Sequence, residues 1–415
     1  MSQTLPAPAI SFPSLRQDVA LIALVSLAHS ISHFSQLVLA PLFPWLKEAF
    51  SVTYTQLGLV LSVFFTVSCA VQAGSGFLVD RFSPRPVLFA GMGCLIVALV
   101  LDALAPAYWV LLAAAVLAGV GNGVFHPVDY TLFNRRVAPH RLGHAYSAHG
   151  ISGSLGWAVA AALMVPMALA FSWRWAFFSA AVLATGVLVL LIVQREVLVL
   201  APPSGAGLAP SGAAAKEDSA GSDFGFLRIP AVWMCFAFFF FYSVVLSVIQ
   251  AYAPEAAHHL HEVPLQWVAA CLTIYMVASA GGMVLGGFLA SDPARCERVV
   301  ALGIGAAAVV ALNLALSPVP GPWVPVLFGV MGFASGIASP SRDLLVKKST
   351  PANATGRVYG VVYAGLDIGQ AVAPVLFGRL MDQGQYTEVL LGLAAVQSVL
   401  IVSAFNVRKV RRTAH

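Results

Sequence analysis

The chain contains a long internal repeat without a gap. Gly119 recurs as Gly332, so the offset is 332 − 119 = 213 positions. The same offset relates further pairs along both halves: Gly123 and Gly336, Pro127 and Pro340, Gly143 and Gly356, Tyr146 and Tyr359, Gly156 and Gly369, Ser30 and Ser243, Pro41 and Pro254. Two homologous halves restrict the chain to architectures built by duplication.

Each half is too apolar for a water-soluble domain. Hydrophobic residues make up 59% and charged residues 9% of the chain, and the mean hydropathy is +0.87. Soluble domains carry roughly 25% charged residues, and about 20 mostly apolar residues span the hydrocarbon core as a helix. The sequence therefore predicts an all-α membrane protein with twelve spans, near 18–43, 55–79, 86–105, 109–133, 143–168, 173–193, 230–254, 265–290, 297–316, 322–346, 357–380 and 386–407.

The repeat groups these spans into two pseudo-symmetric six-helix bundles. We expect an N-terminal bundle over residues 1–193 and a C-terminal bundle over residues 230–415. The stretch 194–229 contains the run Pro202–Gly205, a composition that suits a flexible cytoplasmic tether. In secondary transporters, such a duplication places a binding site between the halves, near the bilayer midplane.

The basic residues predict the orientation of the chain in the membrane. With both termini in the cytoplasm, all Lys and Arg residues except Lys47, Arg174 and Arg379 lie on the inner side. Cytoplasmic loops carry the excess of Lys and Arg, so we expect a multi-pass protein of the inner (plasma) membrane with both termini inside. The net charge of +5 reflects this bias and does not indicate a nucleic-acid surface.

A sequence signature follows the second span. The segment from Gly76 through Asp80 and Arg81 to Arg85 resembles the G-x-L-x-D-R-x-x-x-R signature of the major facilitator superfamily. A degenerate copy, 287–292, follows the eighth span, and Ser83 replaces the usual glycine after the Asp-Arg pair. The resemblance implies the major facilitator fold, in which Asp80 caps helix ends or pairs with cytoplasmic arginines while glycines allow close helix packing.

Two further stretches resemble the fosmidomycin-resistance branch of efflux proteins within that superfamily. One runs from Ala28-His29-Ser30 on to 43–47, and the other is the run 124–127 in the fourth span. The chain has His33 where that branch has an acidic residue, and its fifth span lacks the antiporter proline. The branch resemblance implies drug efflux, while these departures leave uptake open.

Ionisable and amide side chains lie inside the predicted spans. A charged side chain at the bilayer centre costs several kcal/mol, so such residues tend to be functional. The predicted substrate and proton pathway consists of His29, His33, Gln36, His126, Asp129, His149, Asp367 and Gln370.

The superfamily resemblance implies that the first, fourth, seventh and tenth helices line a central cavity. On that basis we expect His29, His33, His126 and Asp129 to converge in the N-terminal half. Histidine titrates near neutral pH, which suits a proton carrier, and Asp367 in the eleventh span is the other candidate. The alternative for the histidines is that they bond backbone carbonyls or cap kinks.

The repeat also suggests a gate. Asp129 corresponds to Arg342 at the offset of the repeat, and opposite charges at related positions near the cytoplasmic end could pair when an inner gate closes. The alternative is that Arg342 pairs with Asp343 or extends to the interface. The predicted gating and conformational residues are Gly76, Asp80, Arg81, Arg85, Asp129 and Arg342.

Reversing the charge at one gate position, as in Asp129→Arg or Arg342→Asp, should abolish transport because like charges then face each other. Reversing both should restore it, since the pair is re-formed with opposite polarity. Solute uptake into vesicles measures the three variants. A double variant as inactive as the single ones removes the pairing.

These features favour a proton-coupled secondary transporter that exports a polar or anionic drug-like compound. The alternatives are uptake of a metabolite or metal chelate, and a transport-inactive sensor or scaffold on the same fold. No GxxxxGK[ST] run occurs, so ATP is not the direct energy source. A membrane metalloenzyme is disfavoured, because its metal-binding histidines must meet on one side of the membrane. His29 and His33 lie in mid-membrane, whereas His258, His259 and His261 lie in an external loop. We expect no cofactor, no structural metal and no nucleic-acid partner, and a monomer that interacts with solute, protons and lipid.

Overall fold

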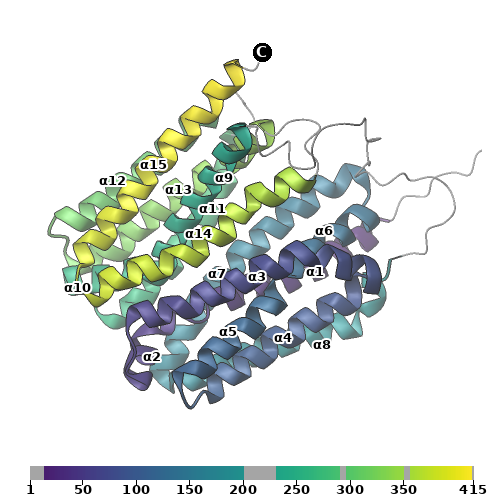
Figure 1. Ribbon diagram of the computed structural model, residues 1–415, viewed down its shortest axis with the longest axis horizontal. Helices are drawn as coiled ribbons and strands as arrows, with labels where there is room; N and C mark the ends of the chain where they lie inside the picture. The colour runs from purple at the N-terminus through teal and green to yellow at the C-terminus, as the bar shows by residue number, and fades with distance from the viewer. Residues whose placement is uncertain (1–13, 201–229, 290–295, 350–355, 414–415) are drawn as a thin grey trace, which may run out of the picture.

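The computed structural model (Figure 1) describes residues 14–200, 230–289, 296–349 and 356–413. Within these ranges the regular elements are helices. They are α1 Leu15–Leu37, α2 Phe43–Phe50, α3 Tyr54–Phe82, α4 Pro84–Leu104, α5 Tyr108–Asn122, α6 Phe125–Arg136, α7 Leu142–Ala170, α8 Trp173–Val193, α9 Pro230–Ala251, α10 Ala253–His261, α11 Leu265–Leu289, α12 Cys296–Leu316, α13 Val324–Ser349, α14 Gly356–Asp382 and α15 Tyr386–Thr413. Four short 3₁₀ turns are η1 Ala40–Leu42, η2 Pro139–Arg141, η3 Arg195–Leu198 and η5 Gly321–Trp323.

Most of the predicted spans reappear as helices that can cross a bilayer. Within the described ranges, 10 helices are long and apolar enough. The predicted spans 357–380 and 386–407 coincide with α14 and α15, and the apolar part of α15 is Tyr386–Val402. The prediction of an all-helical membrane protein is therefore confirmed.

Two predicted spans are broken where a single helix was expected. The first span ends at Leu37, and the chain continues through η1 into α2, with a proline near the start of each element. The fourth span is divided between α5 and α6 around Gly123. Pro127, the third residue of α6, has no N–H to donate to the preceding turn. This break starts a new helix just before His126.

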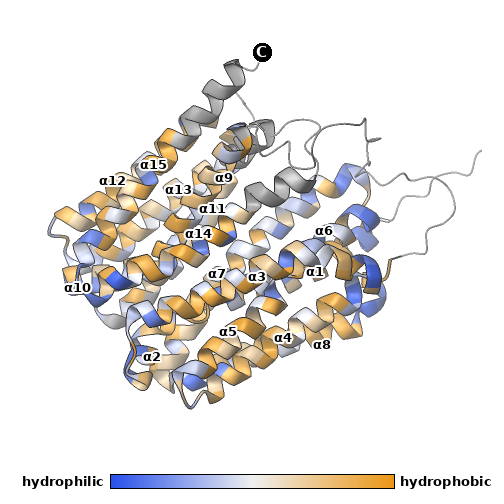
Figure 2. Ribbon diagram, viewed as in Figure 1, coloured by the Kyte–Doolittle hydropathy of each residue, from blue (hydrophilic) through white to orange (hydrophobic). Residues whose placement is uncertain are grey.

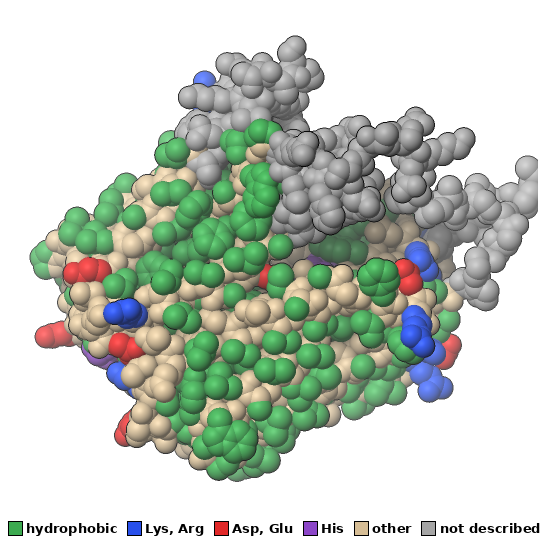
Figure 3. Space-filling view, in the orientation of Figure 1, with side chains coloured by type: hydrophobic (Ala, Val, Ile, Leu, Met, Phe, Trp, Pro, Cys, Tyr) green, Lys and Arg blue, Asp and Glu red, His purple; other side chains and the backbone are tan. Residues whose placement is uncertain are grey.

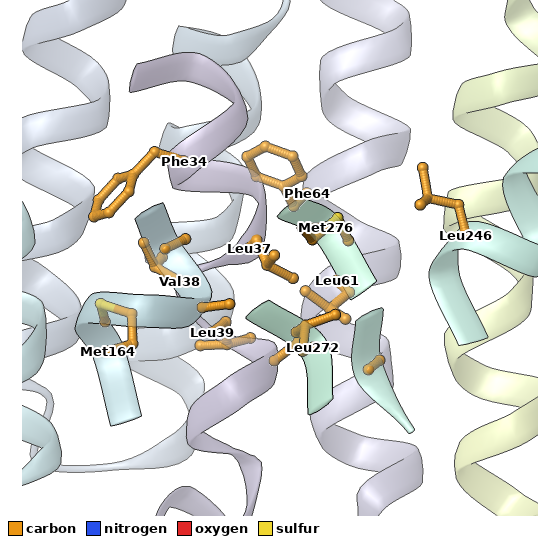
Figure 4. Close-up of a cluster of buried hydrophobic side chains, with 14 of the residues drawn as sticks. Phe34, Leu37, Val38, Leu39, Leu61, Phe64, Met164, Leu246, Leu272 and Met276 are labelled. Atoms are coloured by element: carbon orange, nitrogen blue, oxygen red, sulfur yellow. The ribbon is translucent and has the colours of Figure 1, made fainter. Parts of the chain in front are cut away.

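The helices form two groups, and two helix pairs make the main contacts between them. Helices α1–α8 form one group and α9–α15 the other, and α3 packs on α14 while α7 packs on α11 (Figure 1). Apolar side chains of both groups share one buried cluster. Figure 4 shows part of it, with Phe34, Leu37, Val38, Leu39, Leu61, Phe64 and Met164 from the first group and Leu246, Leu272 and Met276 from the second. The predicted tether largely falls outside the described residues, so its boundaries remain a prediction.

The outer surface is that of a multi-pass membrane protein. Large apolar side chains are exposed along the helices, as in Phe77 at 82% and Val182 at 71%. Hydrophobic residues cover the helix middles and hydrophilic ones gather at the helix ends (Figure 2). Most of the Lys, Arg, Asp and Glu side chains visible on this face likewise lie towards the two ends of the molecule (Figure 3). A surface this apolar is expected only where lipid replaces water.

Close backbone contact joins α11 to α13. A Cβ built at Gly282 would lie 2.3 Å from the carbonyl oxygen of Phe333, whereas one at the neighbouring Gly281 would meet no atom within 4 Å. Small residues allow helices in lipid to approach closely and gain van der Waals contact. An alanine at Gly282 would therefore disturb the packing of the two helices, whereas an alanine at Gly281 would change only the helix propensity of α11.

Gly282→Ala should lower the free energy of unfolding by about 1–3 kcal/mol, because the added methyl group forces α11 away from α13. Gly281→Ala is the control and should leave stability unchanged or raise it, since alanine favours helix. Thermal unfolding of the purified protein in detergent measures both. Equal midpoints for the two variants would contradict the close approach.

Candidate functional site: a buried histidine–aspartate cluster

Five ionisable side chains from three helices converge inside the first group of helices. His29 and His33 come from α1, His126 and Asp129 from α6, and His149 from α7. The ring centroids of His29 and His33 are 4.4 Å apart, and those of His29 and His126 are 5.1 Å apart. The structure thus brings together the four predicted N-terminal residues, and His149 with them.

Asp129 is the acceptor at one end of this cluster. Its Oδ2 lies 3.0 Å from His149 Nε2 and 3.2 Å from His29 Nδ1. The Asp129 side chain is completely buried, and its Oδ1 has no hydrogen-bond partner among the described residues. A buried carboxylate is stable only when it is paired. His149 supplies the hydrogen bond, and His29 Nδ1 lies within ion-pair distance without hydrogen-bond geometry.

His29 connects the two ends of the cluster. Its ring stacks on that of His149 with centroids 3.5 Å apart, its Nδ1 lies near Asp129 Oδ2, and it also contacts the rings of His33 and His126. A neutral imidazole has one donor and one acceptor nitrogen, and a protonated one has two donors. A ring in this position can receive a proton at one nitrogen and give one up at the other.

A glycine on α7 makes room for these rings. A Cβ at Gly153 would lie 2.8 Å from both Cε1 and Nδ1 of His33, and 3.2 Å from Nε2 of His29. One turn further, Trp157 lies against His33 with ring centroids 4.4 Å apart, and its Nε1 donates to Gln36 Oε1 at 3.2 Å. Helix α7 therefore shapes the cluster through one residue without a side chain and one large aromatic.

A neutral polar network continues from Gln36 to Asn122, which the sequence reasoning missed. Asn122 Oδ1 accepts from Ser32 Oγ at 2.6 Å and from Gln36 Nε2 at 3.2 Å. Its Nδ2 donates to Ser68 Oγ at 2.7 Å. One amide thus ties α1 to α3 and α5. The signal in the sequence was an asparagine between two glycines inside an apolar span.

Asp367 lies at a different place from the histidines. It is half-buried on α14 and accepts a long hydrogen bond, 3.4 Å, from Gln72 Nε2 on α3. Gln370 follows Asp367 by about one turn of α14 and is buried, with 7% of its surface exposed. The predicted pathway residues therefore form two groups, and Asp367 belongs to the contact between α3 and α14.

The predicted gating residues lie near the end of α3. Asp80 pairs with Arg135 at 3.6 Å, and both side chains are exposed. Arg81 lies over the ring of Phe82, while a Cβ at Gly76 would meet no atom within 4 Å. No neighbour approaches Gly76 among the described residues, so close helix packing at this glycine stays a prediction.

The structure describes few contacts for the other two predicted gating residues, Arg85 and Arg342. Arg85 is half-buried at the start of α4. The side chain of Arg342 lies outside the described residues, so its pairing with Asp129 stays a prediction. In the described part of the chain, Asp129 has partners within its own half.

Two overlapping triads in the cluster have the geometry to share a cation. The nitrogens and oxygens of His29, His33 and His126, and of His29, Asp129 and His149, lie within 4.8 Å of one another in each set. Imidazole nitrogen with carboxylate oxygen is a donor set that suits zinc, copper or nickel. The same atoms are equally able to hold protons.

Long apolar helices around a buried ionisable cluster define a membrane transporter of small solutes rather than an enzyme. A model of the Major Facilitator Superfamily matches residues 25–374 and 270–412. The chain belongs to the Major Facilitator Superfamily, which confirms the resemblance drawn from its sequence.

Its relatives differ in the solutes they are named for. The fosmidomycin resistance protein of Escherichia coli is 31% identical over 168 residues, which are 40% of this chain and 41% of that protein. A probable nitrate/nitrite transporter of Mycobacterium tuberculosis is 24% identical over 397 residues, 93% of this chain and 95% of that protein. The match to the first relative thus spans about two fifths of its length.

Solved structures share the fold over nearly the whole chain. A bacterial homologue of the human lysosomal transporter Spinster, in an inward-facing and occupied conformation, has a TM-score of 0.75 at 15% identity and covers 97% of this chain and 98% of its own. The nucleoside transporter NupG has a TM-score of 0.71 at 15% identity, with 94% and 99% covered. At this identity the likeness establishes the fold.

Asp129→Ala should lower the free energy of unfolding by about 1–3 kcal/mol, because it leaves His149 Nε2 without its acceptor in a buried site. Asp80→Ala is the matched control. It breaks an exposed pair worth about 1 kcal/mol or less. Thermal unfolding in detergent compares the two, and a loss at Asp80 as large as that at Asp129 would contradict the buried pairing.

Proposed function

We propose that the chain is a proton-coupled exporter of a polar or anionic small solute, working by alternating access between two halves, 1–193 and 230–415. The observation that carries the proposal is the buried cluster of four histidines and one carboxylate. Ionisable groups inside a membrane span tend to mark proton or substrate pathways. The similarity to the fosmidomycin resistance protein supports export as the direction.

The chemistry of imidazole supplies a reason for exchange. A proton on His29 or His33 converts an acceptor nitrogen into a donor. A solute that donates a hydrogen bond needs this nitrogen as an acceptor, and it therefore competes with the proton for the same atom. Such mutual exclusion is what an antiporter requires. An imidazolium would instead favour an anion entering with the proton. The sign of proton movement for a given solute therefore separates export from uptake.

The position in the cell follows from the basic residues. We place the protein as a monomer in the inner (plasma) membrane with both termini cytoplasmic, since only Lys47, Arg174 and Arg379 then lie outside. This orientation puts α2 and α10 on the external side. The tether 194–229 then joins the halves in the cytoplasm.

Proteoliposomes test the proposal. A panel of organic anions, drugs and metal chelates is applied against an imposed pH gradient, and proton movement is read from an internal dye. We expect one solute class to drive protons outward as it enters, and His29→Ala, His126→Ala and Asp367→Asn to reduce this to the level of protein-free vesicles. His144→Ala, an exposed histidine at the start of α7, is the control and should retain activity.

Two results would contradict proton coupling. One is solute flux that survives His29→Ala and His126→Ala, and the other is flux that follows a sodium gradient but no proton gradient. Absence of flux with every solute and either gradient would favour a sensor or scaffold.

A second candidate function is uptake of a metal chelate. It is favoured by the two triads whose donor atoms lie within 4.8 Å of one another, since these can complete the coordination of a chelated cargo metal. It predicts that only chelates drive flux in the panel, and that the same chelator without metal does not.

A further inference from the structure

The N-terminus of α3 provides only part of its own cap. Thr53 and Gln56 form a capping box: Thr53 Oγ1 accepts from the Gln56 N–H at 3.1 Å, and Gln56 Oε1 accepts from the Thr53 N–H at 2.9 Å. The first N–H groups of a helix have no partner within it. The box leaves those of Tyr54 and Thr55 to be satisfied from outside α3.

Asp382, the last residue of α14, supplies these two groups. Its Oδ1 accepts from the Tyr54 N–H at 2.6 Å, and its Oδ2 accepts from the Thr55 N–H at 2.9 Å and from Thr55 Oγ1 at 2.6 Å. A carboxylate is unfavourable at the C-terminus of its own helix and favourable at the N-terminus of another. The placement of Asp382 is therefore explained by α3 and not by α14.

The same face of α3 touches α14 at three successive turns. Below Tyr54, a Cβ at Gly58 would lie 2.4 Å from the carbonyl oxygen of Pro374. One turn further, Ser62 Oγ donates to the carbonyl oxygen of Ala371. From the α14 side, a Cβ at Gly378 would lie 2.8 Å from the carbonyl oxygen of Tyr54. We call this contact the α3–α14 seam.

A second bond secures the end of the seam through α10. Tyr54 OH donates to Glu255 Oε1 at 3.1 Å, and His259 Nε2 lies 3.3 Å from the same oxygen. Lys47 of α2 lies over the Tyr54 ring, 4.4 Å from its centroid. Tyr54 thus has partners on both sides of the boundary between the two groups of helices.

We infer that Asp382 is a positioning residue that closes the α2/α10 end of the transporter, acting as a releasable cap on α3. Alternating access requires the two groups of helices to separate at this end. When they do, the capping box of Thr53 moves with α3, so the helix end stays intact. Asp382 is exposed, so water replaces its hydrogen bonds at once. The cap therefore forms only when Asp382 meets the N-terminus of α3, and it is released at a low cost in free energy.

This inference extends the transport cycle and does not depend on the coupling ion. Hydrogen–deuterium exchange of the purified chain in nanodiscs, without solute or gradient, reads the amides of Tyr54 and Thr55 directly. Asp382→Ala should speed their exchange about fivefold, the factor that corresponds to a typical cap of about 1 kcal/mol. Asp382→Asn keeps one oxygen acceptor and should fall between that variant and the unmodified chain.

Gly378→Ala and Gly58→Ala test the seam, and Gly378→Ala leaves Asp382 and all of α3 unchanged. If the seam acts as one gate, its methyl group pushes α14 from Tyr54, releases the cap and speeds exchange at Tyr54 and Thr55. Gly58→Ala forces the seam apart from the other helix and should do the same. Gly58→Ala acts one turn away from the two amides that report the opening, whereas the methyl group of Gly378→Ala would lie 3.0 Å from the Thr55 nitrogen itself.

Matched controls separate a gate from a local cap. Glu388→Gln removes another exposed carboxylate near the end of the molecule, and Gly93→Ala adds a methyl group where no atom lies within 4 Å; neither should change the exchange. If Gly58→Ala leaves exchange at Tyr54 and Thr55 unchanged, Asp382 is only a local cap and the gate is rejected, whatever the result with Gly378→Ala. Loss of proton flux in the histidine variants cannot alter this result.

Discussion

The carboxylate of Asp129, held between His29 and His149, is the interaction on which the arrangement of the N-terminal half depends. It lies without any exposed surface, with Oδ2 3.0 Å and 3.2 Å from its two partners. An unpaired charge in such a place costs several kcal/mol, so α1, α6 and α7 must keep their positions for the carboxylate to remain paired. The break before α6 and the missing side chain at Gly153 are the backbone features that allow this meeting.

Much of the fold was accessible from the sequence because hydrophobicity and duplication act over long segments. The spans, the repeat and the superfamily motif predicted a helical transporter, and the structure and the family match confirm it. The convergence of His29, His33 and His126 with Asp129 also followed, because the superfamily resemblance implied that the first and fourth helices line one cavity. The breaks at η1 and Gly123 were missed because short interruptions hardly change the mean hydropathy of a span.

The partners of individual side chains were harder to predict, for a physical reason. Repeat symmetry suggested that Asp129 faces Arg342, whereas the described partners of Asp129 are histidines of its own half. Asn122 and Asp382 were missed because their roles depend on the angle and depth at which helices pack. An asparagine in an apolar span and an aspartate at a helix C-terminus are local inconsistencies, and such positions are where function or tertiary contact overrides local preference.

The two halves divide the chemistry unequally, and the division suits a moving interface. At the offset of the repeat, His29, His33, Asn122 and His126 correspond to Tyr242, Leu246, Ser335 and Ser339, which line a small cavity in the C-terminal half. Three histidines of the cluster thus have uncharged counterparts, whereas Asp129 corresponds to Arg342.

The carboxylates that cross between the halves accept from neutral donors. Asp382 accepts from the N-terminus of α3, Glu255 from the hydroxyl of Tyr54, and Asp367 from the amide of Gln72. Separating such contacts exposes groups that water can satisfy, whereas removing one partner of a buried ion pair costs about 3–5 kcal/mol. A transporter that keeps the histidine contacts of its buried Asp129 within one half can therefore open and close without breaking them.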